Sequence, residues 1–343
     1  MDVYNQEITH IEGPISLVEL RLPELNKIFY IFGDEHLHAM TCFDPNTVTI
    51  RIDKFIEKTV VESNKLIDLY LELDFPDQTA SRDIKYQVDK QGDLITYLPT
   101  PDYITDIFHT FYNCFQLNKK DCPYKNIRTH YTDVRYIGTS KYIMSYVNNV
   151  NNVYRNIQQR QINSLFMRRA DVAKQDLRPI IRSIIADGLK ILAILPTKKE
   201  DMYKTAKIDK QLRQIEHPAI LELIHLYYDE KLWTTLSDAE KSYNSYNENS
   251  DIETIRIGIN QLFEYASLLF EVYIIGRIFR KFNDGSTPQN IILYMGDTHS
   301  ERIANFLMTI PGIIFIMETD SNQSEINMQC LDISQFKQPF FTN

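Results

Sequence analysis

Segments with the pattern of β-strands are confined to the two ends of this sequence, and a long block with helical spacing separates them. Apolar runs bounded by turn residues predict strands at residues 15–22, 27–32, 66–75, 127–136, 290–295 and 313–317. Most of 140–242 and all of 252–282 carry helical spacing. This distribution predicts an α/β fold, in which a mainly parallel sheet flanked by helices is built from the N- and C-terminal segments and carries a large helical insertion. We therefore divide the chain into an N-terminal half of the α/β core (1–138), a helical insertion subdomain (139–285) and a C-terminal half of the core (286–343).

The N-terminal strands also indicate how they pair. A short turn at Pro23 and Glu24 joins the first two strands, which is typical of a hairpin. The second strand is followed by helical spacing at 49–64 and then by the apolar run at 66–75. A strand, a helix and a strand at this spacing form a βαβ unit, whose strands run parallel. The remaining patterns predict a polar loop at 77–93, an aromatic-rich helix at 102–115 and an edge strand at 326–331.

Charge and hydropathy exclude several classes of partner. The chain has 37 Lys and Arg against 46 Asp and Glu, with a net charge of −9. Because neutralisation of phosphates supplies much of the affinity for nucleic acids, we expect no nucleic-acid partner. No run of 18 apolar residues occurs, and the N-terminal segment is acidic and polar, so we expect neither a membrane span nor a signal peptide.

The cysteines predict a reducing environment. Cys42, Cys114, Cys122 and Cys330 form no CxxC pair and match no zinc framework. Four cysteines in a chain of this length are ordinary for intracellular proteins, and a Cys114–Cys122 bridge is the open alternative. The expected location is the cytoplasm. The abundance of Ile, Asn, Lys and Tyr suggests an AT-rich coding sequence, and if that sequence belongs to a viral genome, the expected location is the virion.

One short pattern occurs twice, each time directly after an apolar strand. The first copy is Gly33-Asp34-Glu35-His36 and the second is Gly296-Asp297-Thr298-His299. Glycine supplies only 10 of 343 residues, against roughly 7% in average proteins, so each one is favoured at a position that needs it. A strand that ends in Gly and a polar turn places side chains at the carboxyl edge of a sheet, where α/β folds bind ligands. Histidine there can act as a general base or a metal ligand, whereas capping of the following helix by Asp or Ser is the purely structural interpretation.

These residues resemble the superfamily of Tiki and TraB/PrgY proteins, ChaN-like haem-binding proteins and erythromycin esterases. In TraB-like members a first Gly-x-x-His is followed, one helix later, by a strand that ends in Val-Glu-Leu-Asp, which is similar to Leu71-Glu72-Leu73-Asp74. A second Gly-x-x-His opens a helix near the C-terminal end, as Gly296 to His299 does. A helical insertion between the two halves is also typical of the family. The resemblance covers the two ends of the chain and leaves the middle unmatched.

The resemblance implies a hydrolase, either of the esterase or of the metallopeptidase type, that acts on a small molecule or a peptide. The implied catalytic residues are His36, Glu72, His299 and an arginine, with Gly33 and Gly296 lining the bound group. Arg135 is the best candidate for that arginine because it ends a predicted strand, and Arg155, Arg168 and Arg302 are alternatives. If the site holds a divalent metal such as Mn or Zn, His36, His299 and Glu35 are its implied ligands. Without a metal, the same groups suit general-base activation of water, and haem is a further alternative because ChaN-like members bind it.

Two other interpretations remain open at this point. The chain could be a catalytically silent structural or interaction protein. In that case the helical insertion would be the surface that binds a partner protein or a second copy of the chain. No Walker loop, dinucleotide fingerprint, Gly-x-Ser-x-Gly elbow or His-Glu-x-x-His occurs, which argues against nucleotide-dependent enzymes, serine hydrolases and zincins.

Among the other histidines, His38 is a candidate auxiliary ligand and His130 is expected to be a hydrogen-bonded strand residue. In contrast, His109, His217 and His225 have no partner at metal-binding spacing.

Overall fold

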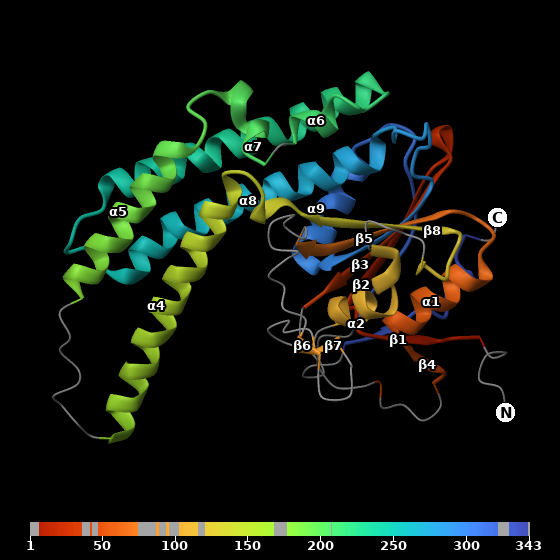
Figure 1. Ribbon diagram of the computed structural model, residues 1–343, viewed down its shortest axis with the longest axis horizontal. Helices are drawn as coiled ribbons and strands as arrows, with labels where there is room; N and C mark the ends of the chain where they lie inside the picture. The colour runs from red at the N-terminus through yellow and green to blue at the C-terminus, as the bar shows by residue number, and fades with distance from the viewer. Residues whose placement is uncertain are drawn as a thin grey trace. The chain divides into compact units, whose positions relative to one another are not determined.

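The computed structural model contains two compact units, and Figure 1 labels most of their helices and strands. It describes residues 7–35, 42, 47–74, 87–88, 94–95, 103–115, 121–167, 177–206, 208–321 and 329–341. Unit 1 combines the residues up to Asp133 with those from Ile278 onward, and unit 2 spans Val134–Arg277. We describe each unit separately.

Unit 1 is built on a six-stranded sheet that mixes strands from both ends of the chain. Its order is β10-β2-β3-β9-β5-β8. The pairs β3–β9, β9–β5 and β5–β8 are parallel, whereas β10–β2 and β2–β3 are antiparallel. The strands are β2 (Ser16–Leu22), β3 (Lys27–Asp34), β5 (Ile67–Asp74), β8 (Ile127–Asp133), β9 (Asn290–Gly296) and β10 (Ile314–Asp320).

Helices cover both faces of this sheet. On one face, α1 (Ile52–Glu62), α2 (Tyr103–Thr110) and α3 (Tyr112–Phe115) pack into a core that includes Leu17, Phe32 and Phe340. Tyr30 stacks on Phe340 in this core, with ring centroids 3.8 Å apart. The opposite face carries α9 (Asp297–Met308), whose buried Ser300 donates a hydrogen bond to the Phe32 carbonyl at 2.8 Å.

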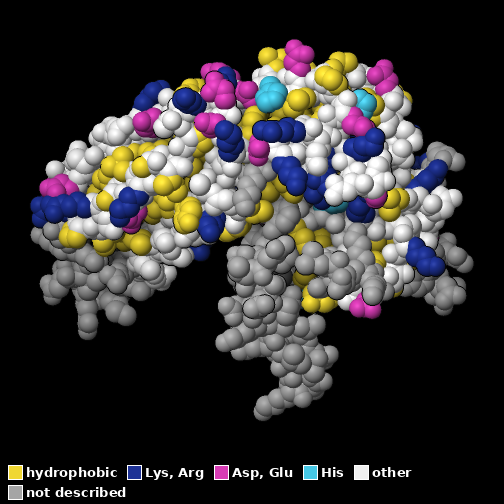
Figure 2. All heavy atoms as spheres, turned by 45° about the horizontal axis from the view of Figure 1, so that its top comes forward, with side chains coloured by type: hydrophobic (Ala, Val, Ile, Leu, Met, Phe, Trp, Pro, Cys, Tyr) yellow, Lys and Arg dark blue, Asp and Glu magenta, His cyan; other side chains and the backbone are white. Residues whose placement is uncertain are grey.

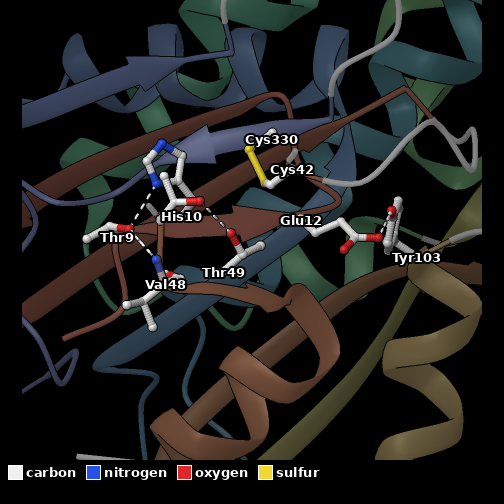
Figure 3. Close-up of a disulfide and its surroundings, with 9 residues drawn as sticks. Thr9, His10, Glu12, Cys42, Val48, Thr49, Tyr103 and Cys330 are labelled. Carbon is white, nitrogen blue, oxygen red and sulfur yellow. Dashed lines mark hydrogen bonds between the residues drawn. A yellow bond between two sulfur atoms is a disulfide. The ribbon is translucent and has the colours of Figure 1, made fainter. Parts of the chain in front are cut away.

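A second, three-stranded sheet lies next to this core. It has the order β11-β1-β4 and consists of β1 (His10–Glu12), β4 (Thr49–Arg51) and β11 (Cys330–Asp332). A disulfide joins Cys330 of β11 to Cys42, with the Cα atoms 5.3 Å apart, and Glu12 of β1 lies opposite Cys330 in the register (Figure 3). A separate short hairpin pairs β6 (Gln87–Val88) with β7 (Leu94–Ile95).

All the α-helical and 3₁₀ elements of unit 2 lie between residues 134 and 279, and its described part contains no strand. They are η5 (Val134–Tyr136), α4 (Ser140–Met167), α5 (Arg178–Ile194), η7 (Lys199–Lys204), α6 (Asp209–Leu212), α7 (Pro218–Ser245) and α8 (Ile252–Phe279), of which α8 ends in unit 1. Buried tyrosines join the helices: Tyr146 and Tyr243 share a hydrogen bond of 2.7 Å between their hydroxyls. Gly188 of α5 lies against the Tyr243 ring. None of the described helices has the length and apolar composition needed to cross a membrane.

The structure is a mixed α/β fold whose sheets contain mostly parallel strands. The predicted hairpin is present as β2 and β3, joined by a 3₁₀ turn at Pro23–Leu25. The predicted parallel orientation of the βαβ strands is also present, but β9 lies between β3 and β5. Both cysteine pairs are disulfides. The Cys114–Cys122 bridge that the sequence left open is confirmed, and the fold also brings together Cys42 and Cys330, which are 288 positions apart and were not predicted to pair.

Candidate functional site

The two Gly-Asp-x-His turns begin side by side at the carboxyl edge of the sheet. Strand β3 and strand β9 are parallel neighbours, and their register pairs Gly33 with Met295 and Asp34 with Gly296. The turns therefore leave the sheet at the same level, although 263 positions separate their glycines in the sequence. This placement agrees with the rule that α/β folds bind ligands beyond the carboxyl ends of their strands.

Glu72 joins the second turn from the other neighbouring strand. Leu71 of β5 pairs with Tyr294 of β9, so Glu72 follows at the edge of the sheet. Glu72 Oε2 accepts a hydrogen bond of 2.7 Å from the Gly296 backbone N–H. Gly296 is the N-cap of α9, where free N–H groups and the helix dipole favour a negative charge.

His299 lies next to the same carboxylate. Its Nε2 is 4.0 Å from Glu72 Oε1, and both side chains are largely buried, with 10% and 7% of their surfaces exposed. This separation allows electrostatic attraction but is longer than a hydrogen bond. His299 lies in the first turn of α9, so its imidazole sits at the edge of the sheet. The structure thus brings together two of the predicted catalytic residues, Glu72 and His299.

Gly33 is required by the close approach of neighbouring side chains. A Cβ atom on Gly33 would overlap Asp297 Oδ1 and Ser16 Oγ and would come within 3.0 Å of the Asp297 Cα atom. Ser16 Oγ donates a hydrogen bond of 2.5 Å to Asp297 Oδ1 across the face of Gly33. No side chain caps α9, so the prediction that Asp297 caps this helix was wrong; its carboxylate instead accepts the Ser16 hydroxyl.

Asp34, which the sequence suggested only as a helix cap, is a buried part of the first turn. Its side chain is 2% exposed, and its Oδ1 accepts a hydrogen bond of 2.8 Å from Gln329 Nε2. Gln329 precedes Cys330, whose disulfide partner Cys42 follows the first turn in the sequence. The hydrogen bond from Gln329 thus ties Asp34, at the start of the turn, to the segment before β11, and the disulfide ties Cys42, after the turn, to β11 itself. Sequence analysis missed Gln329, because no local motif marks a residue 295 positions away from its partner.

The other predicted site residues lie on several different elements or outside the described residues. His36 and His38 lie outside the described residues, as does Arg168. Glu35 is exposed at the end of β3. Arg135 belongs to unit 2, where its guanidinium lies 4.9 Å from the centroid of the Phe270 ring. Arg155 is exposed on α4 and Arg302 lies on α9.

The metal prediction rests on the part of the site that is not described. Within the ranges the structure describes, no group of three or more His, Cys, Asp or Glu side chains is arranged to hold a metal ion. Of the three implied ligands, His299 lies beside Glu72, Glu35 is exposed, and His36 lies outside the described residues. A site for Mn or Zn, and likewise for haem, therefore stays a prediction.

His130 lies in a buried network near the opposite, amino-terminal end of the strands. Its Nε2 is 2.8 Å from Asp68 Oδ1, and Arg128 also binds this carboxylate, with Nη2 3.0 Å from Oδ2. Burial alone raises the pKa of Asp68, but the hydrogen bonds from His130 and Arg128 outweigh burial and lower it overall. This arrangement confirms His130 as a hydrogen-bonded strand residue.

Lys27 lies near the same end of the sheet. Its ammonium donates hydrogen bonds to the carbonyls of Ile278 (3.1 Å) and Pro288. Burial lowers its pKa to about 8. Its position at the amino-terminal end of β3 separates it from Glu72 and His299, so we assign it to the fold and not to the candidate site.

Comparison of the chain with protein-family models, with curated proteins and with solved structures returned no match.

Proposed function

We propose that the protein is a hydrolase whose active site lies at the carboxyl edge of the six-stranded sheet. The observation that carries this proposal is the position of Glu72, which accepts the Gly296 N–H with one oxygen and lies 4.0 Å from His299 Nε2 with the other. The resemblance to the Tiki, TraB and erythromycin-esterase superfamily supports the same assignment.

In this mechanism His299 acts as the general base that removes a proton from water. The charge of Glu72, 4.0 Å from Nε2, stabilises the imidazolium that forms. The bond from Gly296 fixes the carboxylate, because its second oxygen is anchored to the backbone. His299 is 10% exposed, so part of its ring is accessible to a substrate. Most of the pair is shielded from water, which strengthens the electrostatic interaction between Glu72 and His299.

His36 is the proposed second histidine of the site. It follows Asp34 by two residues, and Asp34 is in register with Gly296. With His36, Glu72 and His299 the site would have donors suited to Mn or Zn, which would polarise the scissile carbonyl and lower the pKa of bound water. We also propose that the helices of unit 2 are an insertion into the α/β core.

The experiment is a turnover assay with panels of fluorogenic esters and peptides, run with added Mn²⁺ or Zn²⁺ and with a chelator. We expect His299→Asn to reduce kcat/KM by about 100-fold or more. The control is His225→Asn, at a side chain 42% exposed in unit 2, which should leave kcat/KM unchanged. Equal turnover by His299→Asn and the wild-type protein, or no turnover on any substrate, would contradict the proposal.

A second candidate function is that of an interaction protein, and one observation favours it. A cavity of about 600 Å³ lies between α4 and α5 in unit 2, lined by Tyr142, Val150, Val153, Ile180 and other residues. In Figure 2, hydrophobic side chains gather over the helices at the left of the picture. Sedimentation velocity of Val153→Glu tests self-association here: a smaller sedimentation coefficient than that of the wild-type protein supports this function, and an identical one contradicts it.

A further inference from the structure

Strand β10 lies at the edge of the six-stranded sheet, and among the described strands its side away from β2 is open. Its only partner among the described strands is β2, which it meets in antiparallel register. The Ser321 N–H donates to the Ile15 carbonyl on the β2 side at 2.6 Å. Because backbone groups alternate in direction along a strand, Glu318 and Asp320 direct their N–H and C=O groups away from β2. These are the groups that another strand could pair with.

The side chains of β10 are unusually exposed for an apolar strand. Ile314, Phe315 and Ile316 are 48%, 49% and 39% exposed. The register shifts between Phe315 and Met317, so Ile316 has no partner in β2. This bulge places Phe315 on the same face as Glu318 and Asp320, because it adds one residue to the normal alternation.

A groove runs along this face between β10 and α9. It has a volume of about 550 Å³. Its acidic end contains Asp297, Glu301, Glu318 and Asp320, and its apolar end contains Met308 and Phe315. The bond between Ser16 and Asp297 holds the start of α9 beside the end of β10, because Ser16 is paired with Asp320.

The carboxylates of the groove repel one another. Partial burial, followed by the charges of Asp297 and Glu301, raises the pKa of Asp320. Burial and the charges of Asp320, Glu301 and Asp297 likewise raise the pKa of Glu318. None of the ion pairs found among the described residues brings a Lys or Arg to these four carboxylates. A cationic partner would relieve this repulsion.

We propose that β10 and this groove bind an extended segment of a partner protein that carries Lys or Arg at one end and apolar side chains at the other. The segment adds a strand to the open side of β10, its cations lie against Glu318 and Asp320, and its apolar side chains pack on Phe315 and Met308. A second copy of the chain is a poorer occupant, since it would bring a further set of these carboxylates to a protein whose net charge is −9. The proposal does not rest on hydrolysis by Glu72 and His299.

The test is binding of a dye-labelled nine-residue peptide to the full chain, measured by fluorescence anisotropy. Thr occupies every second position of the peptide, and the positions between carry two Lys in one half and two Leu in the other. The peptide is made once in this order and once in the reverse order. We expect one direction to bind, and we expect Glu318→Gln combined with Asp320→Asn to weaken binding at least tenfold. The control, Glu62→Gln combined with Glu222→Gln, removes the same charge from exposed positions outside the groove and should not change the affinity.

Two further peptides separate the strand from the charges. A peptide with N-methylated amides cannot form the strand and should not bind, and a peptide with Glu in place of Lys should not bind either. Equal binding of the N-methylated peptide, or equal weakening by the control variant, would overturn the proposal. Absence of peptide binding together with dimerisation that Phe315→Ser abolishes would also overturn it, because a second copy would then be the occupant.

Discussion

The carboxylate of Glu72 accepts a hydrogen bond of 2.7 Å from the backbone N–H of Gly296, which ties the end of β5 to the second Gly-Asp-x-His turn. The bond spans 224 positions of sequence and joins two parallel neighbours in the centre of the sheet. Because the other oxygen of Glu72 faces His299, the same side chain both anchors the turn and meets the histidine. The geometry of the candidate site therefore depends on the pairing of β5 with β9.

Substitution of Gly33 tests the close packing of the two turns. Gly33→Ala should destabilise the protein by about 1–3 kcal/mol, because its Cβ would displace Asp297 and Ser16. Combining it with Ser16→Gly removes one of the two overlaps and should recover part of that loss. Gly276→Ala is the control, since its Cβ meets its nearest neighbour, Leu212, at an ordinary 3.4 Å. Urea unfolding measures all four free energies, and an unperturbed Gly33→Ala protein would contradict the packing.

The buried Lys27 predicts a rise in stability with pH. The folded protein releases this proton near pH 8, whereas the unfolded chain keeps it to about 10.5. Between these values the unfolded state binds more protons, so the free energy of unfolding increases with pH, by about 3 kcal/mol in total. The measurement is the difference in unfolding free energy between the wild-type protein and Lys27→Met from pH 7 to 10.5.

That difference should shift in favour of the wild-type protein as the pH rises. Lys210→Met, at an exposed position, should show a constant difference from the wild-type protein over the same range. If the Lys27→Met difference is also constant with pH, the Lys27 ammonium is not buried as described.

The two disulfides predict that the native protein has no free thiol. Alkylation of the unfolded, unreduced protein followed by mass spectrometry should detect no modified cysteine. Replacing Cys42 and Cys330 by Ser should cost roughly 2–5 kcal/mol and more than the same change at Cys114 and Cys122, because the first bridge closes a far longer loop. Four alkylated thiols would contradict both bridges and would restore the expectation of a reducing compartment.

Local features of the fold could be predicted from sequence, and long-range pairings could not. The β2–β3 hairpin follows from alternation and a short turn at Pro23. The position of β9 between β3 and β5 depends on pairing between segments more than 200 positions apart, for which a single sequence carries no signal. The Asn-rich segment at 148–152 has low helix propensity, yet α4 continues through it, because propensity is weaker than packing.

The candidate site shows the same division. Glu72 and His299 could be identified because each belongs to a short motif near the end of an apolar strand, and both motifs resemble those of the family. Gln329 and Ser16 contact Asp34 and Asp297 from 295 and 281 positions away in the sequence, so no spacing rule marks them. The apolar run at β10 has the composition of a buried strand, and only its position at the edge of the sheet explains why Phe315 is half-exposed.

A double-mutant cycle on Glu72 and His299 tests the central claim most directly. Glu72→Gln keeps an oxygen to accept the Gly296 N–H but removes the charge beside His299. We predict that Glu72→Gln and His299→Asn each lower kcat/KM for the hydrolysed substrate by about 100-fold or more, and that the double variant loses little beyond the larger single effect, because the pair acts as one unit. Single variants that retain kcat/KM within about threefold of the wild-type protein, while remaining folded, would contradict the claim.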